Sequence, residues 1–280
     1  MTKLKIGFLH PGAMGISLAA TVGNTGHTVY WVSEGRSEAT RQRAESQNLH
    51  DAGTLEALCD TCTVIVSICP PHAAEDVARK VLACGFRGLY LDANAISVER
   101  TERIARQMED SGASFVDGSV IGGPAWEPGR TWLYLAGPQA PEIADCFAAG
   151  PLETALLGGD IGKAAAIKMC FAAYTKGTSA LLAAILATAE ASGVREALEH
   201  QWSRTGSEFA AQTRQRVQQV TAKAWRFAGE MEEIDATFRS AGVPGGFHSA
   251  AAEIYRRLAP FKDAEAPPEL DAVLNTLLRH

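Results

Sequence analysis

The stretch KIGFLHPGAMG, from Lys5 to Gly15, decides the fold of the first half of this 280-residue chain. Its apolar beginning predicts a buried strand, and the residues from Met14 to Asn24 predict a helix closed by Gly26. A glycine-rich turn between a strand and a helix is typical of a dinucleotide-binding site, because the helix N-terminus offers free N–H groups and a partial positive charge. The stretch therefore predicts a cofactor loop at the start of a βαβ unit.

The glycine pattern of this loop is incomplete. A G-x-G-x-x-G motif would place glycines at positions 10, 12 and 15, and the chain has His10 at the first of them. Gly12 would let the backbone approach a pyrophosphate, and Gly15 would allow close packing of helix against strand. Pro11 fixes its own φ and holds His10 extended, so this pair can form the turn in another way. The alternative is a strand–helix turn that binds nothing. The predicted cofactor-binding residues of the loop are His10, Pro11, Gly12, Ala13 and Met14.

Strands alternate with helices through the first half of the chain. Further strands are predicted at residues 27–32, 63–68, 88–93 and 113–118, and helices at 73–83 and 98–111. This alternation predicts an α/β fold with a Rossmann-type doubly wound parallel sheet, whose ligands bind in loops at the carboxyl ends of the strands. These loops are predicted to be HPGAMG, SEGRS, CPPH, NAIS and GSVIGGPAW.

The pattern changes near residue 160. Residues from Gly162 to about Ala191 contain no proline and predict one helix of about 30 residues, and the remaining chain is predicted to be helical. We therefore expect a dinucleotide-binding domain over residues 1–160 and an all-helical substrate and dimerisation domain over residues 161–280.

The residues after the second predicted strand bear on the choice of cofactor. In NAD-binding chains an acidic residue takes the ribose hydroxyl at this place. Here Ser33 occupies that position, followed by Glu34, Arg36 and Ser37. A guanidinium and hydroxyl groups suit a 2′-phosphate, so the pattern favours NADP, with Ser33, Arg36 and Ser37 as ligands. Glu34 would favour NAD, and a solvated polar loop is the remaining alternative.

Composition narrows the class of partner. The net charge of −6 argues against nucleic acid and anionic membranes, and no apolar run approaches the roughly 20 residues of a membrane span. We expect a cytoplasmic protein. Cys59 and Cys62 form a C-x-x-C that suits a redox or half-zinc site, but no second ligand pair follows, so buried thiols are favoured and no metal is predicted.

Several segments resemble the beta-hydroxyacid dehydrogenase superfamily, which includes hydroxyisobutyrate and phosphogluconate dehydrogenases. The resemblance covers most of the first 180 residues. It rests on IGFLHPGAMG (6–15), LDANAIS (91–97), FVDGSVIGGPAWEPGRTWLYLAG (115–137) and IKMC (167–170). Segments 226–238 and 243–263 resemble the helical C-terminal domain of a poorly characterised phosphogluconate-dehydrogenase-like branch, which also tends to carry His-Pro in the glycine loop.

The resemblance implies that Lys168 is the catalytic proton-transfer residue. Apolar neighbours on a helix would desolvate this lysine and lower its pKa, and the alternative is a lysine with its amine in water. The resemblance expects a serine at Ile121 and an asparagine at Ala172, so the usual small hydroxyacids are in doubt. The predicted substrate residues are Ser119, Gly122, Gly123, Thr175 and His248, of which His248 has packing as its alternative role.

Together these expectations describe an NADP-dependent oxidoreductase that transfers hydride between nicotinamide and a small hydroxyacid-like carbonyl or alcohol. Cys69, Pro70 and Asn94 are expected near the nicotinamide, with the substrate between the domains. The long helix and the family resemblance predict a homodimer. The alternatives are an imine reductase on the same scaffold and a non-catalytic NADP-binding sensor.

Overall fold

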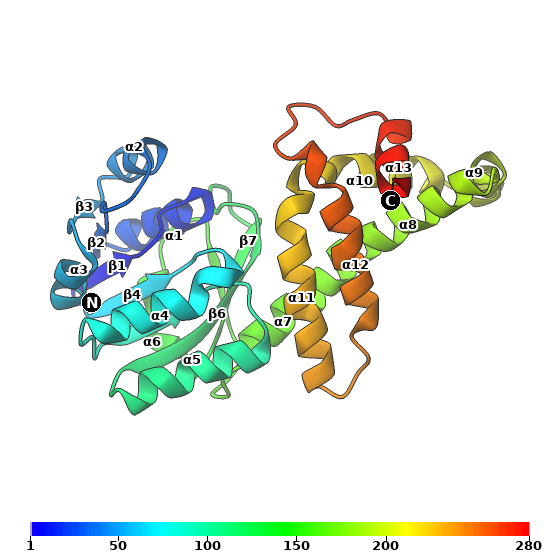
Figure 1. Ribbon diagram of the computed structural model, residues 1–280. Coiled ribbons are helices and arrows are strands. Elements are labelled where there is room, and N and C mark those ends of the chain that lie inside the picture. The colour runs from blue at the N-terminus through cyan, green and yellow to red at the C-terminus, as the bar shows by residue number, and fades with distance from the viewer. Residues whose placement is uncertain (1, 280) are drawn as a thin grey trace. The chain divides into compact units, whose positions relative to one another are not determined.

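The computed structural model describes residues 2–279 and divides into two compact units, one ending at Lys168 and the other beginning at Met169 (Figure 1). The first unit contains the sheet, and the second unit is helical. The predicted α/β fold followed by a helical region is confirmed. The predicted boundary near residue 160 stays a prediction.

The sheet of the first unit has eight strands among the described residues, in the order β3-β2-β1-β4-β5-β6-β7-β8. All neighbours are parallel except β6 and β7, which are antiparallel. Strands β2 and β3 are added on one side of β1 and strands β4 and β5 on the other. The loops after β1 and β4 therefore open beside each other at the carboxyl edge, where such sheets bind ligands. The strands are β1 (Lys5–Phe8), β2 (Thr28–Trp31), β3 (His50–Asp51), β4 (Val64–Ser67), β5 (Leu89–Asp92), β6 (Ser114–Gly122), β7 (Thr131–Ala136) and β8 (Glu153–Leu156).

Helices cover both faces of this sheet, and each face packs against its helices in a separate apolar core. Leu18 and Val22 of α1 (Ala13–Asn24) and Ile143 of α6 (Ala140–Cys146) pack on one face. The other face carries residues of α3 (Leu55–Thr61), α4 (Ala74–Ala83) and α5 (Val98–Asp110). The unit also contains α2 (Glu38–Ser46) and the short 3-10 helix η1 (Pro71–Ala73). Burial of the sheet on both faces explains why its central strands are continuous apolar runs.

The structure differs from the prediction at the end of the sheet. Strands β7 and β8 and helix α6 were not predicted, and the segment Gly118–Gly122, predicted as part of a loop, continues β6. The reason is pairing: residues 117–122 of β6 bond to residues 131–136 of β7 in an antiparallel ladder. Ser119 and Gly122 therefore lie on a strand.

The second unit consists of helices packed around one another. Helices α11 and α12 lie side by side, as Figure 1 shows within this unit. The helices are α8 (Thr178–Ala191), α9 (Arg195–Ser203), α10 (Phe209–Gln219), α11 (Ala224–Ser240), α12 (Gly246–Arg257) and α13 (Leu270–Leu278).

The predicted long helix is present over Lys163–Ala191, but it is not a continuous α-helix. Helix α7 (Lys163–Ala172) passes into a π-helical turn, Ala173–Gly177, before α8 begins. Within the described residues this helix is long and apolar enough to cross a membrane, and 44% of its most apolar window is buried. A core helix meets the same criterion, so the finding is weak evidence for a span.

Candidate functional site

The loop after β1 forms a three-residue turn at His10. The N–H of Gly12 donates to the carbonyl oxygen of His10 at 2.8 Å, which closes an i to i+2 turn with Pro11 at its centre. The fixed φ of proline suits this position. His10 and Pro11 therefore provide the turn that a first glycine would otherwise make.

Gly12 and Gly15 have different surroundings. A Cβ on Gly12 would meet nothing within 4 Å, so its backbone faces open space. A Cβ on Gly15 would collide with the carbonyl oxygen of His10, so only glycine fits there. Helix α1 begins directly after Gly12, with no side-chain cap and no acidic residue in its first turn. The first N–H groups of α1, including those of Ala13 and Met14, are thus suited to receive an anion.

The His10 side chain lies in a cationic environment. Burial, together with the charges of Arg36 and Lys80, lowers the pKa of His10 to about 4, so its imidazole is neutral at pH 7. His10 Nδ1 and Arg36 Nε are buried, and neither has a hydrogen-bond partner among the described residues. Burial also lowers the pKa of Arg36, although the nearby Cys69 opposes this effect. His10, Arg36 and Cys69, which follow β1, β2 and β4, therefore lie near one another. Two buried nitrogen atoms of this group have no partner among the described residues.

The predicted 2′-phosphate residues lie at the start of α2. Ser33 is buried, and its carbonyl oxygen accepts the N–H of Arg36 at 3.1 Å and the guanidinium of Arg41 at 2.9 Å. Ser37 is exposed, and its hydroxyl lies 3.1 Å from that of Thr40. The predictions did not include Arg41; its position four residues after Ser37, on the same helix face, was the available signal.

Asn94 connects the two loops that were predicted to face the nicotinamide. Its Oδ1 accepts the N–H of Cys69 at 2.6 Å, and its Nδ2 donates to the hydroxyl of Ser67 at 3.1 Å. Its own N–H donates to Asp92 at 2.9 Å. Burial raises the pKa of Asp92 to about 7, with the neighbouring Asp117 adding to the effect and the bonds from Asn94 opposing it. The Asn94 side chain thus fixes the shape of the loop after β4.

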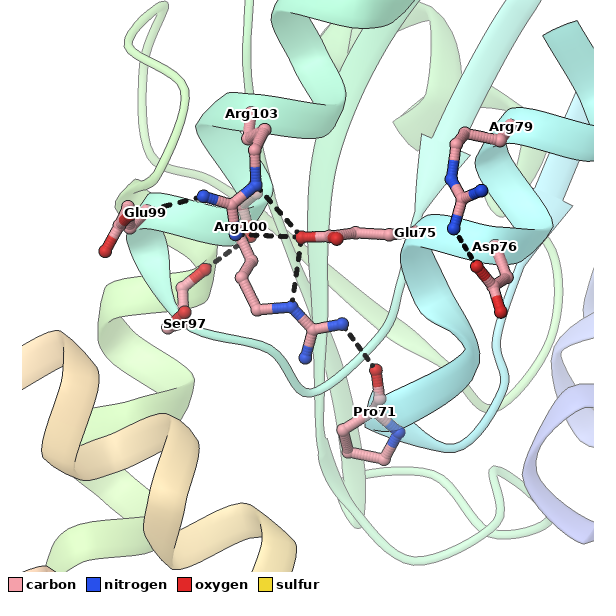
Figure 2. Close-up of polar contacts among 9 residues, drawn as sticks. Pro71, Glu75, Asp76, Arg79, Ser97, Glu99, Arg100 and Arg103 are labelled. Carbon is pink, nitrogen blue, oxygen red and sulfur yellow. Dashed lines mark hydrogen bonds and ion pairs between the residues drawn. The ribbon is translucent and has the colours of Figure 1, made fainter.

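An ion-pair network holds the same loop from the side of α5 (Figure 2). Glu75 of α4 accepts hydrogen bonds from Arg100 at 3.2 Å and from Arg103 at 2.9 Å, both on α5. Arg100 also donates to the carbonyl oxygen of Pro71 at 3.0 Å. Burial raises the pKa of Glu75, but the bonds from Arg103 and Arg100 outweigh it, and the net shift is downward. Pro70 lies just before this anchored turn and is exposed.

Lys168 is held against strand β6. Its Nζ donates to the carbonyl oxygen of Val120 at 2.7 Å, and the lysine is half-buried. At the beginning of the same helix, Asp117 Oδ2 accepts the N–H groups of Gly162 and Ala164, each at 2.9 Å. Burial raises the pKa of Asp117 to about 6, although these backbone bonds lower it. The predictions did not include Asp117, whose signal is a charged residue inside an apolar strand.

The remaining predicted substrate residues of the first unit have distinct surroundings. Ser119 is buried, and its hydroxyl has no hydrogen-bond partner among the described residues. Gly122 has φ +124°, and a Cβ there would collide with the carbonyl of Arg130, so the turn toward β7 explains this glycine. A Cβ on Gly123 would meet nothing within 4 Å. Gly123 therefore faces open space, whereas the unpaired hydroxyl of Ser119 is enclosed by the protein.

Thr175 and His248 lie in the second unit. The Thr175 hydroxyl donates to the carbonyl of Phe171 at 3.0 Å, within the long helix. His248 is buried and makes edge contacts with the rings of Phe238 and Phe247. Its Nδ1 has no hydrogen-bond partner among the described residues. These contacts are those of a packed histidine, and contact of either residue with a substrate stays a prediction.

The cysteine pair behaves as buried thiols. Cys59 and Cys62 are both buried and free, and burial raises the pKa of each thiol to about 12. The described residues contain no group of three or more His, Cys, Asp or Glu side chains that would hold a metal ion.

Comparison with known families decides the class of the chain. Residues 5–144, half of the chain, match the NAD-binding domain of 6-phosphogluconate dehydrogenase. The chain belongs to this dehydrogenase family. It is therefore an NAD(P)-dependent oxidoreductase, and the open backbone at Gly12 with the uncapped α1 fits a nicotinamide dinucleotide. Residues 189–258 match a domain of unknown function (DUF1932). The resemblance expected from the sequence is confirmed.

Solved structures of dehydrogenases and reductases have the same fold as this chain. A conserved protein of unknown function, described as similar to 3-hydroxyacid dehydrogenases, is 28% identical, with a TM-score of 0.69 over 92% of this chain and 98% of that one. Mycobacterium tuberculosis 3-hydroxyisobutyrate dehydrogenase is 19% identical, with a TM-score of 0.71 over 99% and 100% of the two chains. The Aspergillus terreus reductive aminase is 18% identical, with a TM-score of 0.56 over 98% and 99%.

Proposed function

We propose that this protein is an NADP-dependent oxidoreductase that transfers hydride between the nicotinamide and a small hydroxyacid-like carbonyl or alcohol substrate. The observation that carries the proposal is the fixed amine of Lys168, which is held on the Val120 carbonyl in the unit that also contains the glycine loop. The cofactor, when bound, supplies or accepts the hydride. The protein must then hold the cofactor, orient the substrate and move the proton on the substrate oxygen.

The cofactor-binding part of the proposal rests on the loops after β1, β2 and β4. The N–H groups following Gly12 would receive the pyrophosphate, because α1 has no side-chain cap of its own. Arg36 and Ser37, with Arg41 behind them, would receive the 2′-phosphate. Arg36, whose Nε has no partner among the described residues, and Lys80 both act on His10 with positive charge, which a dianionic phosphate would neutralise. This favours NADP over NAD.

Lys168 is the proposed proton-transfer residue. The bond to the Val120 carbonyl fixes the position of the Lys168 amine, from which a lysine can exchange a proton with a substrate oxygen. The unpaired hydroxyl of Ser119, on the strand that holds Lys168, is the proposed polar contact for the substrate. Gly123, Thr175 and His248 complete the proposed set.

Turnover with defined substrates tests the role of Lys168. Oxidation of NADPH is measured over a panel of 2- and 3-oxo acids, neutral ketones and cyclic imines for the wild type, Lys168→Ala and the control Lys163→Ala. Lys163 lies one and a half turns earlier on the same helix and pairs with Asp160 at its surface. We expect Lys168→Ala to lower kcat by about 100-fold or more, within the range for general acid–base groups, and Lys163→Ala to be neutral. Equal kcat for all three proteins would refute the role of Lys168.

Titration with both cofactors tests the choice of NADP. The dissociation constants of NADPH and NADH are measured by fluorescence for the wild type, Arg36→Ala and Arg43→Ala, which removes the same charge from the last turn of α2. Loss of one charge-assisted phosphate contact should weaken NADPH binding by about 10-fold to 100-fold and leave NADH unchanged. If Arg36→Ala keeps the NADPH affinity, Arg36 does not bind the phosphate.

An imine reductase is the second candidate, because two positions that suit polar substrate ligands are apolar and buried. Ile121 and Ala172 occupy the places where the hydroxyacid dehydrogenase resemblance expects a serine and an asparagine. The reductive aminase structure, solved with NADPH and ethyl levulinate, has the same fold. Turnover of the cyclic imines alone would favour this activity. Tight NADPH binding with no turnover of any panel member would favour a non-catalytic sensor.

The proposed oxidoreductase is a homodimer. Its proposed location is the cytoplasm. The long helix exposes three large apolar side chains, those of Phe171, Tyr174 and Leu181, at helical spacing. Pairing with a second copy of the chain would remove this surface from water. Sedimentation equilibrium is expected to give twice the chain mass, and Leu181→Glu should shift the protein to the monomer. A wild-type monomer at all concentrations would contradict this assembly.

A further inference from the structure

A carboxylate buried inside strand β6 holds the start of the helix that carries Lys168. Asp117 is 1% exposed, and its Oδ2 accepts three backbone N–H groups, from Gly162 at 2.9 Å, Ala164 at 2.9 Å and Ala165 at 3.3 Å. The first N–H groups of a helix have no partner within the helix. Asp117 supplies that partner from a strand that lies 45 residues earlier in the chain.

The same strand also holds the lysine itself. Val120 lies three residues after Asp117 on β6, and its carbonyl oxygen accepts Lys168 Nζ at 2.7 Å. Gly162 and Lys168 are separated by about 9 Å along the helix axis, at 1.5 Å per residue. Strand β6 therefore contacts the helix at two points, by a side chain at its start and by a backbone oxygen at the lysine.

The start of the helix is fixed by more than one contact. Gly162 has φ +98°, which favours glycine, and a Cβ there would lie 2.9 Å from Val98 Cγ1. A carboxylate suits this position better than a neutral amide, because it accepts several N–H groups on one oxygen and matches the positive end of the helix dipole. Loss of this carboxylate would release the helix start while leaving its other packing in place.

We propose that Asp117 is the positioning residue of Lys168. By binding the first turn of α7, it sets the position of the next two turns, so that Lys168 Nζ stays on the Val120 carbonyl. The catalytic meaning of this arrangement rests on the proposed proton transfer by Lys168. The arrangement itself can be tested without any substrate.

Chemical labelling of lysine amines tests the arrangement directly. The full-length wild type, Asp117→Asn and Asp160→Asn react with N-hydroxysuccinimidyl acetate, and acetylation at each lysine is followed by mass spectrometry after chymotryptic digestion. Asp160→Asn is the matched control, because it removes the same charge beside the same helix start, from an exposed pair with Lys163. Exposed Lys223 calibrates the reagent. Lys176, which pairs with Glu230, reports general opening of the protein.

The expected result is a selective change at one lysine. Lys168 should be acetylated about tenfold faster in Asp117→Asn than in the wild type, since its amine would leave the Val120 carbonyl more often. Lys176 and Lys223 should react at unchanged rates. In Asp160→Asn, Lys168 should be acetylated at the wild-type rate. An unchanged Lys168 rate overturns the proposal. An equal increase at Lys168 and Lys176 also overturns it, because the variant has then loosened the whole protein.

Kinetics separate this proposal from the proposed function. With the panel compound that the wild type reduces fastest, Asp117→Asn should lower kcat about tenfold at unchanged NADPH affinity. In a Lys168→Ala background it should lower kcat no further, because a residue that acts through Lys168 has no effect once the amine is absent. Independent losses in the double variant would overturn the proposal. If Lys168→Ala alone keeps full kcat, the proposed function fails, and the labelling still decides whether Asp117 positions the lysine.

Discussion

The carbonyl oxygen of His10 occupies the space in which a side chain at Gly15 would place its Cβ. The same oxygen accepts the N–H of Gly12 at 2.8 Å. One backbone atom therefore closes the turn of the loop and lies in close contact with the first turn of α1. This explains why the loop keeps its third glycine when the first is replaced by His10.

Alanine substitutions should separate the roles of the two remaining glycines. Gly15→Ala would force the His10 carbonyl away and should destabilise the protein by about 1–3 kcal/mol, the usual cost of overpacking. Gly12→Ala meets no protein atom within 4 Å, so its unfolding free energy should change little. Its added methyl group would instead fill the space proposed for the pyrophosphate and weaken NADPH binding. Urea unfolding and NADPH titration measure the two effects.

The reverse pattern would contradict this assignment. If Gly12→Ala lowers stability while keeping NADPH affinity, the open space beside Gly12 is not the cofactor site. Gly23→Ala, in the last turn of α1, provides the control outside the loop, because a Cβ there also meets nothing within 4 Å. Gly23→Ala should leave NADPH affinity unchanged.

The low pKa of His10 should appear in the pH dependence of stability. Burial, with Arg36 and Lys80, lowers this pKa from 6.5 in the unfolded chain to about 4. Between these values the unfolded chain binds a proton that the folded protein does not, so stability falls as the pH falls from 6.5 to 4. His10→Gln removes this titration. The free energy of unfolding of the wild type, relative to that of His10→Gln, should be lower at pH 4.5 than at pH 7. A constant difference across this range would show that His10 titrates normally.

The sequence predicted the part of the fold in which local pattern and burial agree. The strands β1, β2, β4 and β5 are short apolar runs buried by helices on both faces, so their composition alone identifies them. Strands β7 and β8 have a more mixed pattern, with half-buried or exposed residues such as Trp132 and Glu153. The antiparallel partner of Ser119–Gly122 lies beyond an intervening turn, and a glycine-rich segment was therefore predicted to be a loop.

Site residues divide in a similar way. Gly12, Gly15 and Lys168 belong to local motifs, so the sequence alone can propose them as site residues. Asp117 acts through helix N–H groups 45 to 48 residues away, so no local pattern reveals its partner. The π-helical turn at Ala173–Gly177 also has no local sequence signal, because two of its carbonyl oxygens, those of Thr175 and Lys176, accept side-chain donors from α10 and α12.

The Glu75 ion-pair network should stabilise the loop after β4 only above acidic pH. The pKa of Glu75 is lowered from its ordinary value of 4.5, because the bonds from Arg103 and Arg100 outweigh burial. A carboxyl group with a lowered folded pKa contributes stability above its unfolded pKa and loses it as the pH falls through the folded value. Glu75→Gln should therefore lower the melting temperature at pH 7 and have a smaller effect at pH 3. Asp76→Asn, which breaks an exposed pair with Arg79, should have little effect at either pH. Equal shifts for the two variants would contradict a special role for Glu75.

The π-helical turn depends on hydrogen bonds from outside its own helix. Tyr255, fully buried on α12, donates its hydroxyl to the Lys176 carbonyl at 2.7 Å, and Arg216 of α10 donates to the carbonyl of Thr175. Tyr255→Phe would leave the Lys176 carbonyl without this donor and should destabilise the protein by about 1–3 kcal/mol. Tyr174→Phe makes the same atomic change at a side chain that is 68% exposed, and should stay within about 0.5 kcal/mol of the wild type. Amide hydrogen exchange should accelerate at Gly177–Ser179 in Tyr255→Phe alone. Similar exchange and stability in both variants would mean that the turn persists without the Tyr255 hydroxyl.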